Sequence, residues 1–217
     1  MKHNSFFASW SGGKDSCLAL WKALKEGYKV SYLLNMLNET GSKSRSHGLP
    51  KDILILQSKS IGIPIVQRNT TWSNYEAEFK TVVKELKSLG VKGGIFGDIY
   101  LQEHCDWIER VCNEININVL LPLWKAPTKK LAEEFISEGF EAIIVSVKAD
   151  IFEESWLGRL LDENLLEDLI TIGVDPCGEA GEYHTPVIDG PLFKKRVSFQ
   201  TDGIFIQNGY RLPKFVC

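Results

Sequence analysis

Short apolar runs alternate with helix-like patterns along the first two thirds of the chain. Residues 6–10 form an apolar run typical of a strand, and apolar residues then recur at three- and four-residue intervals toward Gly27, as on one face of a helix. The alternation predicts further strands at 30–36, 64–66, 94–97 and 118–121, and further helices at 49–61, 75–89 and 101–115. Alternating β and α units of this kind are typical of an α/β fold with a parallel sheet.

The rhythm breaks at residues 122–127, which contain two prolines, and we expect a domain boundary there. The expected domains are residues 1–124 and a smaller α/β domain of residues 125–217. In the second domain the pattern predicts a helix from an N-cap at Thr128 to Gly139, a strand at 142–147, acidic helical stretches to about residue 170, and a hairpin around Asp202-Gly203.

Composition excludes several classes of protein. The 217 residues are 44% hydrophobic and 24% charged, which is ordinary for a globular protein and excludes disordered and collagen-like chains. With 28 acidic against 25 basic side chains, a protein that coats nucleic acid is not expected. There is no apolar run of about 20 residues and no signal-peptide pattern, so we expect a cytoplasmic protein with no membrane partner.

The cysteines indicate neither a disulfide framework nor a zinc site. They are odd in number and include no CxxC pair. The five residues are Cys17, Cys105, Cys112, Cys177 and Cys217. Cys17, Cys105 and Cys112 fall on apolar helix faces and are expected in the core. Only Cys177 lies beside the glutamates at 179 and 182, and one thiol without a nearby partner argues against thiolation chemistry.

The most informative segment, SWSGGKDS, runs from Ser9 to Ser16 between the first expected strand and helix. Gly12 and Gly13 allow the backbone N–H groups to approach an anion, and the following helix adds its positive dipole end. Lys14 adds a full charge, and Ser11 and Ser16 can donate to phosphate oxygens. We therefore predict a phosphate-binding loop.

The loop belongs to neither of the two most common nucleotide-binding types. A Walker A loop needs glycine where Ala8 stands and serine or threonine where Asp15 follows the lysine. A dinucleotide fingerprint needs GxGxxG, which this segment does not contain.

At these residues the chain resembles the PP-loop ATP pyrophosphatases, which share the adenine nucleotide alpha hydrolase fold. Further motifs in order resemble the diphthine-ammonia ligase family in particular. They are CLAL after the loop, RSHGLP at 45–50, FGDI at 96–99, His104, LPLW at 121–124 and DPCGEAGEYHT at 175–185. Two positions depart from the pattern of many relatives, which carry glycine at Ala180 and an acidic residue at His184.

The resemblance implies a reaction and its substrates. ATP activates a carboxylate of diphthine on elongation factor 2 as an acyl-adenylate with release of pyrophosphate, and ammonia then displaces AMP to leave an amide. No glutaminase segment is visible, so the nitrogen is expected from free ammonia or a separate protein. ATP and Mg²⁺ are the expected cofactors. The sequence leaves the oligomeric state open, a homodimer included.

The GEAGE segment places Glu179 and Glu182 three residues apart between glycines. Two carboxylates can position an amine, accept a proton or hold Mg²⁺. A solvated acidic turn is the alternative from local sequence alone. With the resemblance, we predict that both glutamates are catalytic and bind substrate, together with Tyr183 and His184.

Other candidates lie where strands are expected to end. Asp98, after Gly97, stands where parallel sheets place ligand sites, and we predict a catalytic and Mg²⁺-binding role for it; a helix N-cap is the alternative. Asp15 is the other candidate metal ligand. We predict that Gly97, His47 and Met36 border the nucleotide and that Arg45 and His104 bind substrate. From local sequence alone, core packing is equally compatible for Met36, a loop histidine such as His47 is more often solvent-facing, and His104 is a weaker candidate than Asp98.

Two rival functions remain open at this stage. One is a PP-loop ATP pyrophosphatase or amidoligase that acts on a different carboxylate or carbonyl. The other is a regulatory module that binds the nucleotide without turnover.

Overall fold

A five-stranded parallel sheet organises the first half of the computed structural model, which describes residues 5–216. Its strand order is β3-β2-β1-β4-β5. The strands are β1 (Ser5–Ser9), β2 (Lys29–Leu37), β3 (Ile65–Asn69), β4 (Val91–Ile95) and β5 (Asn118–Leu120). The connecting helices are α1 (Lys14–Lys25), α2 (Lys51–Ile61), α3 (Tyr75–Ser88) and α4 (Gln102–Glu114). The expected α/β fold with a parallel sheet is confirmed.

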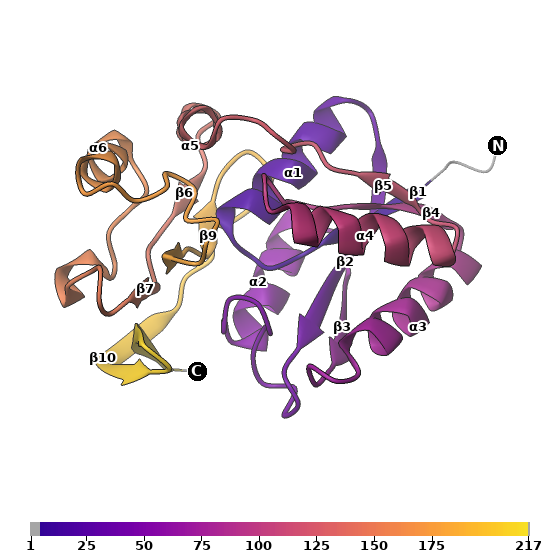
Figure 1. The fold of residues 1–217 in the computed structure, drawn as a ribbon, viewed down its shortest axis with the longest axis horizontal. Helices are drawn as coiled ribbons and strands as arrows, with labels where there is room; N and C mark the ends of the chain where they lie inside the picture. Colours follow the sequence, from indigo (N-terminus) through magenta and orange to yellow (C-terminus); the bar gives the residue numbers. More distant parts are fainter. Residues whose placement is uncertain (1–4, 217) are drawn as a thin grey trace.

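Side chains alternate between two cores along β1, as a strand buried on both faces requires. Phe6 and Ala8 pack into one cluster with buried residues of α1 and α2. Phe7 packs into the other with the buried faces of α3 and α4. Figure 1 shows α3 and α4 together in front of the sheet.

The second half adds short helices and two small antiparallel sheets. The elements are α5 (Thr128–Ser137), β6 (Glu141–Ala142), β7 (Ser146–Lys148), η1 (Glu154–Trp156), α6 (Glu163–Thr171), β8 (Tyr183–His184), β9 (Val187–Asp189), β10 (Gln200–Gln207) and β11 (Tyr210–Val216). One sheet has the order β10-β11-β7-β8 and the other pairs β6 with β9. No helix within residues 5–216 is long and apolar enough to span a membrane.

Three local predictions for this half were wrong. The helix α5 starts at Thr128, and Pro127 is its N-cap. The strand predicted at 142–147 divides into β6 and β7, because between them the Ile143 N–H donates to Pro186 O and the Ile144 N–H to Arg159 O. The hairpin turns at Asn208-Gly209, while Asp202-Gly203 lies within β10 where its register against β11 shifts.

The larger core joins the two halves of the chain. It contains buried residues of β1 and α1 together with residues of α5, α6 and β9, such as Leu131, Leu165 and Val187. The C-terminal half lies against the end of the parallel sheet where the phosphate loop is found (Figure 1).

Candidate active site

A cavity of about 480 Å³ opens between the carboxyl end of the parallel sheet and the loops of the C-terminal half. In open parallel sheets this end is the usual position of a ligand site. The predicted site residues that line it are Ser9, Ser11, Lys14, Asp15, Ser16, Met36, Arg45, His47, Gly97, Asp98, His104, Glu179, Tyr183 and His184. Gly12, Gly13 and Glu182 do not line it.

The phosphate loop has the tight turn that its glycines predicted. A Cβ atom on Gly12 would lie 2.5 Å from Leu54 Cδ2 and 2.7 Å from Gln57 Oε1, so no larger residue fits. The Ser11 hydroxyl lies 3.0 Å from that of Ser16, which donates to Gly13 O at 3.0 Å. Gly13 is the N-cap of α1 and caps it with no side chain, so the first N–H groups of the helix are left for an anion.

The C-terminal half holds this loop in place. The N–H of Val187 donates to Gly12 O at 2.9 Å, and Gly13 forms a β-bridge with Pro186. Gln57 of α2, fully buried, donates through Nε2 to Gly12 O and Val187 O at 2.9 and 2.8 Å. Its Oε1 accepts from Trp10 Nε1 at 3.0 Å. Gln57 was missed from the sequence, where its one signal is a polar residue inside the apolar face of a helix.

Lys14 points toward the C-terminal loop at residues 175–183. Its ammonium donates to Asp15 Oδ2 at 2.9 Å and to Cys177 O, and it lies 5.1 Å from the ring centre of Tyr183. Burial by itself lowers the pKa of Lys14, but the neighbouring groups, with Asp15 first among them, together more than offset this and the pKa is raised above its ordinary value. The side chain is therefore a buried cation beside the phosphate loop.

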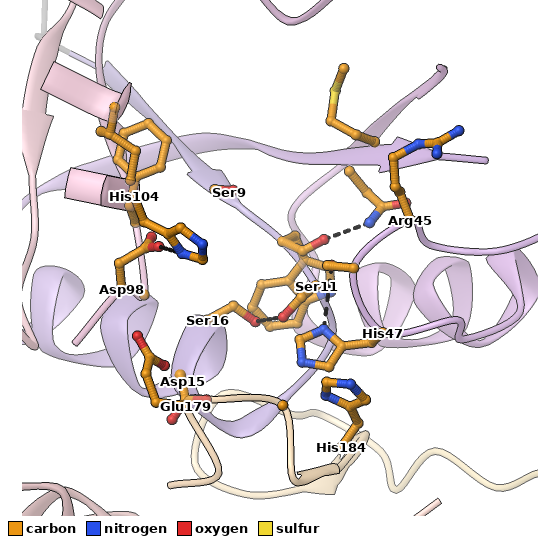
Figure 2. A pocket seen from close by; sticks show the side chains of 18 of the residues that line it. Ser9, Ser11, Asp15, Ser16, Arg45, His47, Asp98, His104, Glu179 and His184 are labelled. Atoms are coloured by element: carbon orange, nitrogen blue, oxygen red, sulfur yellow. Dashed lines mark hydrogen bonds and ion pairs between the residues drawn. The ribbon is translucent and has the colours of Figure 1, made fainter. Parts of the chain in front are cut away.

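Glu179 and Asp98 face the same cavity from opposite halves of the chain (Figure 2). Glu179 Oε1 accepts from the Ile99 N–H at 3.0 Å, which ties the GEAGE loop to the residue that follows Asp98. Burial raises the pKa of Glu179 to about 7, and the nearby carboxylates of Asp15 and Asp98 add to the effect. Such a carboxyl group can exchange a proton near neutral pH.

His104 is paired with Asp98 at the same edge of the cavity. Its Nδ1 lies 3.2 Å from Asp98 Oδ1, and this hydrogen bond raises the pKa of His104 (Figure 2). The pair links β4's end to the first turn of α4.

The structure separates Glu182 from Glu179. Glu182 Oε2 is buried with no hydrogen-bond partner, and the main-chain oxygen of this residue accepts from the Lys148 N–H at 2.9 Å. Tyr183, by contrast, is buried under Lys14 and donates its hydroxyl to Pro176 O at 2.5 Å. The two glutamates of GEAGE therefore occupy different environments.

His47 and His184 meet across the two halves of the chain. Their ring centres are 4.5 Å apart and their planes nearly perpendicular. Burial lowers the pKa of His184 to about 4 and also lowers that of His47, with Lys14 acting in the same direction on both. Both rings are therefore neutral at pH 7 and lie beside Gly13, whose added Cβ would be 3.3 Å from His47 Nε2.

Arg45 lies on the far side of the cavity from the phosphate loop (Figure 2). Its Nε donates to Thr70 Oγ1 at 2.8 Å, and its guanidinium carbon is 4.9 Å from the ring centre of Trp72. A second contact joins it to Glu39 Oε1 at 3.1 Å. The geometry does not bring Arg45 to the phosphate loop with His47.

Two buried oxygens of the cavity wall have no hydrogen-bond partner among residues 5–216. They are Asn35 Oδ1 and Thr185 Oγ1, on side chains whose residues are each 2% exposed. Buried polar atoms are rarely left unpaired, so both are available to a molecule bound in the cavity. Neither residue was predicted, and Asn35 could have been found as a polar residue inside the apolar end of its strand.

No group of three or more metal-binding side chains occurs within residues 5–216. A Mg²⁺ ion that bridges phosphates needs only one or two protein carboxylates. Lys14 donates to one oxygen of Asp15, and His104 pairs with one oxygen of Asp98, so each carboxylate keeps a second oxygen that could contact the ion. The donor set fits such an ion.

The cysteines of the described residues are thiols. Cys17, Cys105, Cys112 and Cys177 are free and buried, while Cys217 lies outside the described part of the chain. Burial raises the pKa of Cys177, whose sulfur lies 3.3 Å from Thr128 O. A protonated, buried thiol is a poor nucleophile.

Comparison with known proteins gives a consistent family. The protein-family model of the diphthamide synthase N-terminal domain matches residues 4–119, and the family model of the diphthamide synthase C-terminal domain matches residues 127–212. Diphthine–ammonia ligase of Rattus norvegicus is 29% identical, over 91% of this chain and 84% of its own. The Homo sapiens enzyme of the same name is 27% identical, with the same two coverages.

Solved structures were matched as well, and one of them is described as a predicted subunit of tRNA methyltransferase from Methanocaldococcus jannaschii. The alignment covers 89% of this chain and 100% of that chain, with 18% identity and a TM-score of 0.48. The two family models together span nearly the whole sequence, and the chain belongs to the diphthamide synthase family.

Proposed function

We propose that this chain is an ATP-dependent ligase that converts the carboxylate of diphthine on elongation factor 2 into an amide. A carboxylate oxygen of diphthine attacks the α-phosphorus of ATP, and pyrophosphate leaves. Ammonia then attacks the carbonyl carbon of the acyl-adenylate, AMP leaves, and the nitrogen loses a proton to a base. The observation that carries the proposal is that the phosphate loop and the GEAGE loop line one cavity.

The nucleotide half of the reaction falls to the phosphate loop. The N–H groups at the start of α1 and the hydroxyls of Ser11 and Ser16 hold phosphate oxygens, with Lys14 as the nearby cation. Ser9, Gly97 and Met36 border the nucleotide, and Asn35 Oδ1 accepts a hydrogen bond from it. Neutral His47 and His184 bound the phosphate end of the cavity.

The acceptor half falls to the carboxylates. Glu179, with its pKa of about 7, takes the proton that the attacking ammonia loses. Asp98 and His104 orient the acceptor, and Tyr183 supports Lys14. Glu182 acts from behind the cavity by shaping the GEAGE loop. Mg²⁺, held by Asp15 or Asp98 together with the phosphates, would neutralise charge as pyrophosphate forms.

The two segments of the chain have different roles in this reaction. The segments 1–124 and 125–217 divide the work, the first binding ATP and the second completing the acceptor side. The reaction takes place in the cytoplasm, with ammonia as the nitrogen source.

The test is the production of AMP and pyrophosphate from Mg-ATP and ammonium, with and without diphthine-bearing elongation factor 2. We expect release that depends strictly on the factor, and a gain of one amide per AMP by mass spectrometry. AMP release at the same rate with and without the factor would point to another acceptor. No AMP release with any acceptor would point to a nucleotide-binding module.

Two variants make the test specific to this site. We expect Lys14→Ala to abolish pyrophosphate release. Glu179→Gln should leave ATP binding intact and lose amide formation, because the amide cannot take the proton from the attacking ammonia. Full turnover by Lys14→Ala would contradict the assignment of the phosphate loop.

A further inference from the structure

One wall of the cavity, remote from the phosphate loop in sequence, is built of aromatic rings. Trp72, Tyr75 and Trp107 all line the cavity, and we call them the aromatic wall. The ring centres of Tyr75 and Trp107 are 5.7 Å apart with planes at 50°, so the two rings form an open corner. Trp72 continues the wall, with its ring centre 6.2 Å from that of Tyr75, and is 75% exposed.

The corner is held rigidly from behind. The Trp107 indole Nε1 donates to Glu76 Oε2 at 3.1 Å. Glu76 is fixed in turn by Arg110 and Lys80, at 2.6 Å each. Phe79, 2% exposed, packs against Trp107 with ring centres 5.3 Å apart. A ring held in this way is preorganised for a ligand rather than free to turn.

Charges of both signs lie around this wall, since the guanidinium carbon of Arg45 is 4.9 Å from the ring centre of Trp72. Asp98 and Glu179 line the same cavity. Burial raises the pKa of Tyr75 to about 12, and the charge of Asp98 contributes to the rise while that of Arg45 opposes it. Asp98 is thus close enough to Tyr75 for its charge to raise the pKa of the Tyr75 hydroxyl.

Aromatic faces with nearby carboxylates suit one class of ligand. Phosphate groups would be repelled by the charges of Asp98 and Glu179 in the absence of a bridging metal ion, and a neutral purine would gain from them only a hydrogen bond from its amino group. An organic cation gains from both, because its charge is attracted to the ring faces and to the carboxylates, and its methyl groups are shielded from water. The cavity therefore has an anion end at the phosphate loop and a cation end at the aromatic wall.

We propose that the aromatic wall binds the quaternary ammonium group of the acceptor substrate. This inference rests on the proposed function, because diphthine carries a trimethylammonium group on the carbon that bears its carboxyl group. Binding of that group at the wall directs the neighbouring carboxylate toward the nucleotide. The wall thereby selects the fully methylated acceptor over a precursor with a primary amine, which is strongly hydrated.

The first test compares substitutions by their effects on the two substrates. We expect Trp107→Leu and Trp72→Leu to raise KM for diphthine-bearing elongation factor 2 by about 3- to 30-fold, the range for loss of one cation–π contact, and to leave KM for ATP unchanged. Trp72 is exposed, so its variant tests the wall even if Trp107→Leu fails to fold.

Trp156→Leu is the matched control. Trp156 carries Arg159 at 4.8 Å from its ring centre, as Trp72 carries Arg45, but it does not line this cavity. We expect it to leave both KM values unchanged. A rise in KM for ATP with KM for the factor unchanged in the wall variants would assign the wall to the nucleotide and overturn the inference.

The second test needs no turnover. Choline and 3,3-dimethylbutan-1-ol have the same shape and differ by one charge. We expect choline to shift the indole NMR signals of Trp107 and Trp72 in the wild type, and the alcohol to leave them in place at the same concentration. Equal shifts from both compounds, or none from choline, would overturn the inference. If choline binds while no AMP forms with any factor, the proposed function fails and the cation site stands.

Discussion

At the scale of single residues, Gly97 shows how closely the site is packed. A Cβ atom on this residue would lie 2.9 Å from the main-chain carbon of Asp15 and 2.9 Å from the nitrogen of Ser16. Backbone atoms cannot rotate away as a side chain does, so either β4's end or the start of α1 must move. The requirement for glycine at 97 therefore comes from the phosphate loop across the sheet.

We expect Gly97→Ala to lower ATP turnover by at least tenfold and to cost about 1–3 kcal/mol of stability, the usual range for overpacking. Turnover is measured by AMP release and stability by urea unfolding. Gly27→Ala is the control. Gly27 has φ 88° with open space around it, so alanine there costs about 1 kcal/mol of strain and leaves turnover intact. Equal losses of turnover in the two variants would contradict the steric argument.

Glu179 gives a pH-dependent prediction. Its pKa is raised from 4.5 to about 7 by burial, so the folded protein keeps this proton to a higher pH than the unfolded chain does. The wild type should therefore lose stability relative to Glu179→Gln as the pH rises from about 4.5 to about 7, with no further change above 7. Urea unfolding of both proteins across this range measures the difference. A difference that is constant, or of opposite sign, would show that the carboxyl group is not desolvated.

Residue types in a motif predicted some of these positions and not others. Asp98 and Glu179 meet in one cavity as their motifs suggested, because a strand end and a glycine-flanked loop expose such side chains. Glu182 has the same type of neighbours in sequence but faces away, since the pairing of β8 with β7 decides its direction. Asn35 and Gln57 carry no motif, and their roles depend on partners far away in sequence.

At the scale of elements, α2 links the phosphate loop to the C-terminal half through Gln57. Its amide makes three buried hydrogen bonds, to Gly12, Trp10 and Val187. Each buried partner left unpaired costs about 1–3 kcal/mol.

We expect Gln57→Leu to lower stability by about 2–4 kcal/mol, since a leucine of similar volume leaves the Trp10 N–H and Val187 O unpaired. The displaced loop should also raise KM for ATP. Urea unfolding and AMP release measure the two effects. Gln102→Leu, on the exposed surface of α4, should change neither. Unchanged ATP kinetics in Gln57→Leu would mean that the loop keeps its shape without this helix.

The C-terminal hairpin shows where element prediction fails. Asp202-Gly203 and Asn208-Gly209 are both typical hairpin turn pairs. Asn208 and Gly209 have φ values of 51° and 80° and form the turn, while Gly203, with φ 67°, lies at the irregular register inside β10. Local sequence cannot separate a turn from a bulge here, because the pairing of whole strands decides between them.

At the scale of the whole molecule, the two halves of the chain share one core. Leu165 of α6 is fully buried in the same cluster as Phe6 and Ala8 of β1. Segments that share a core are expected to unfold together. We therefore expect the parts of the chain before and after residue 124 to fold as one unit.

We expect Leu165→Ala to lower the unfolding free energy by about 2–5 kcal/mol, as for other leucines truncated in a core. Native-state hydrogen exchange should show the same loss of protection at the backbone amides of β1 and β4 as at those of α6. Ile170→Ala, at a 41% exposed position of the same helix, should change both by less than about 0.5 kcal/mol. Loss of protection in α6 alone would show that the halves unfold separately.

Much of this architecture could be predicted, because the strands and helix of each βαβ unit in the first half follow one another in a continuous stretch of sequence. The periodicity of residues 6–121 placed all five strands and four helices of the sheet in order. The second half resisted prediction because its strands are two or three residues long in most cases and pair across long intervals, so their partners outweigh local propensity.

The bridge between Gly13 and Pro186 bears on how the protein is made. The phosphate loop precedes Val187 by a long stretch of chain, yet its final hydrogen bonds come from Val187 and its neighbours. A ribosome must therefore translate the whole intervening segment before the loop acquires its last partners. During synthesis the growing N-terminal half carries an unfinished nucleotide site, and ATP cannot select the native arrangement until the late segment has left the exit tunnel.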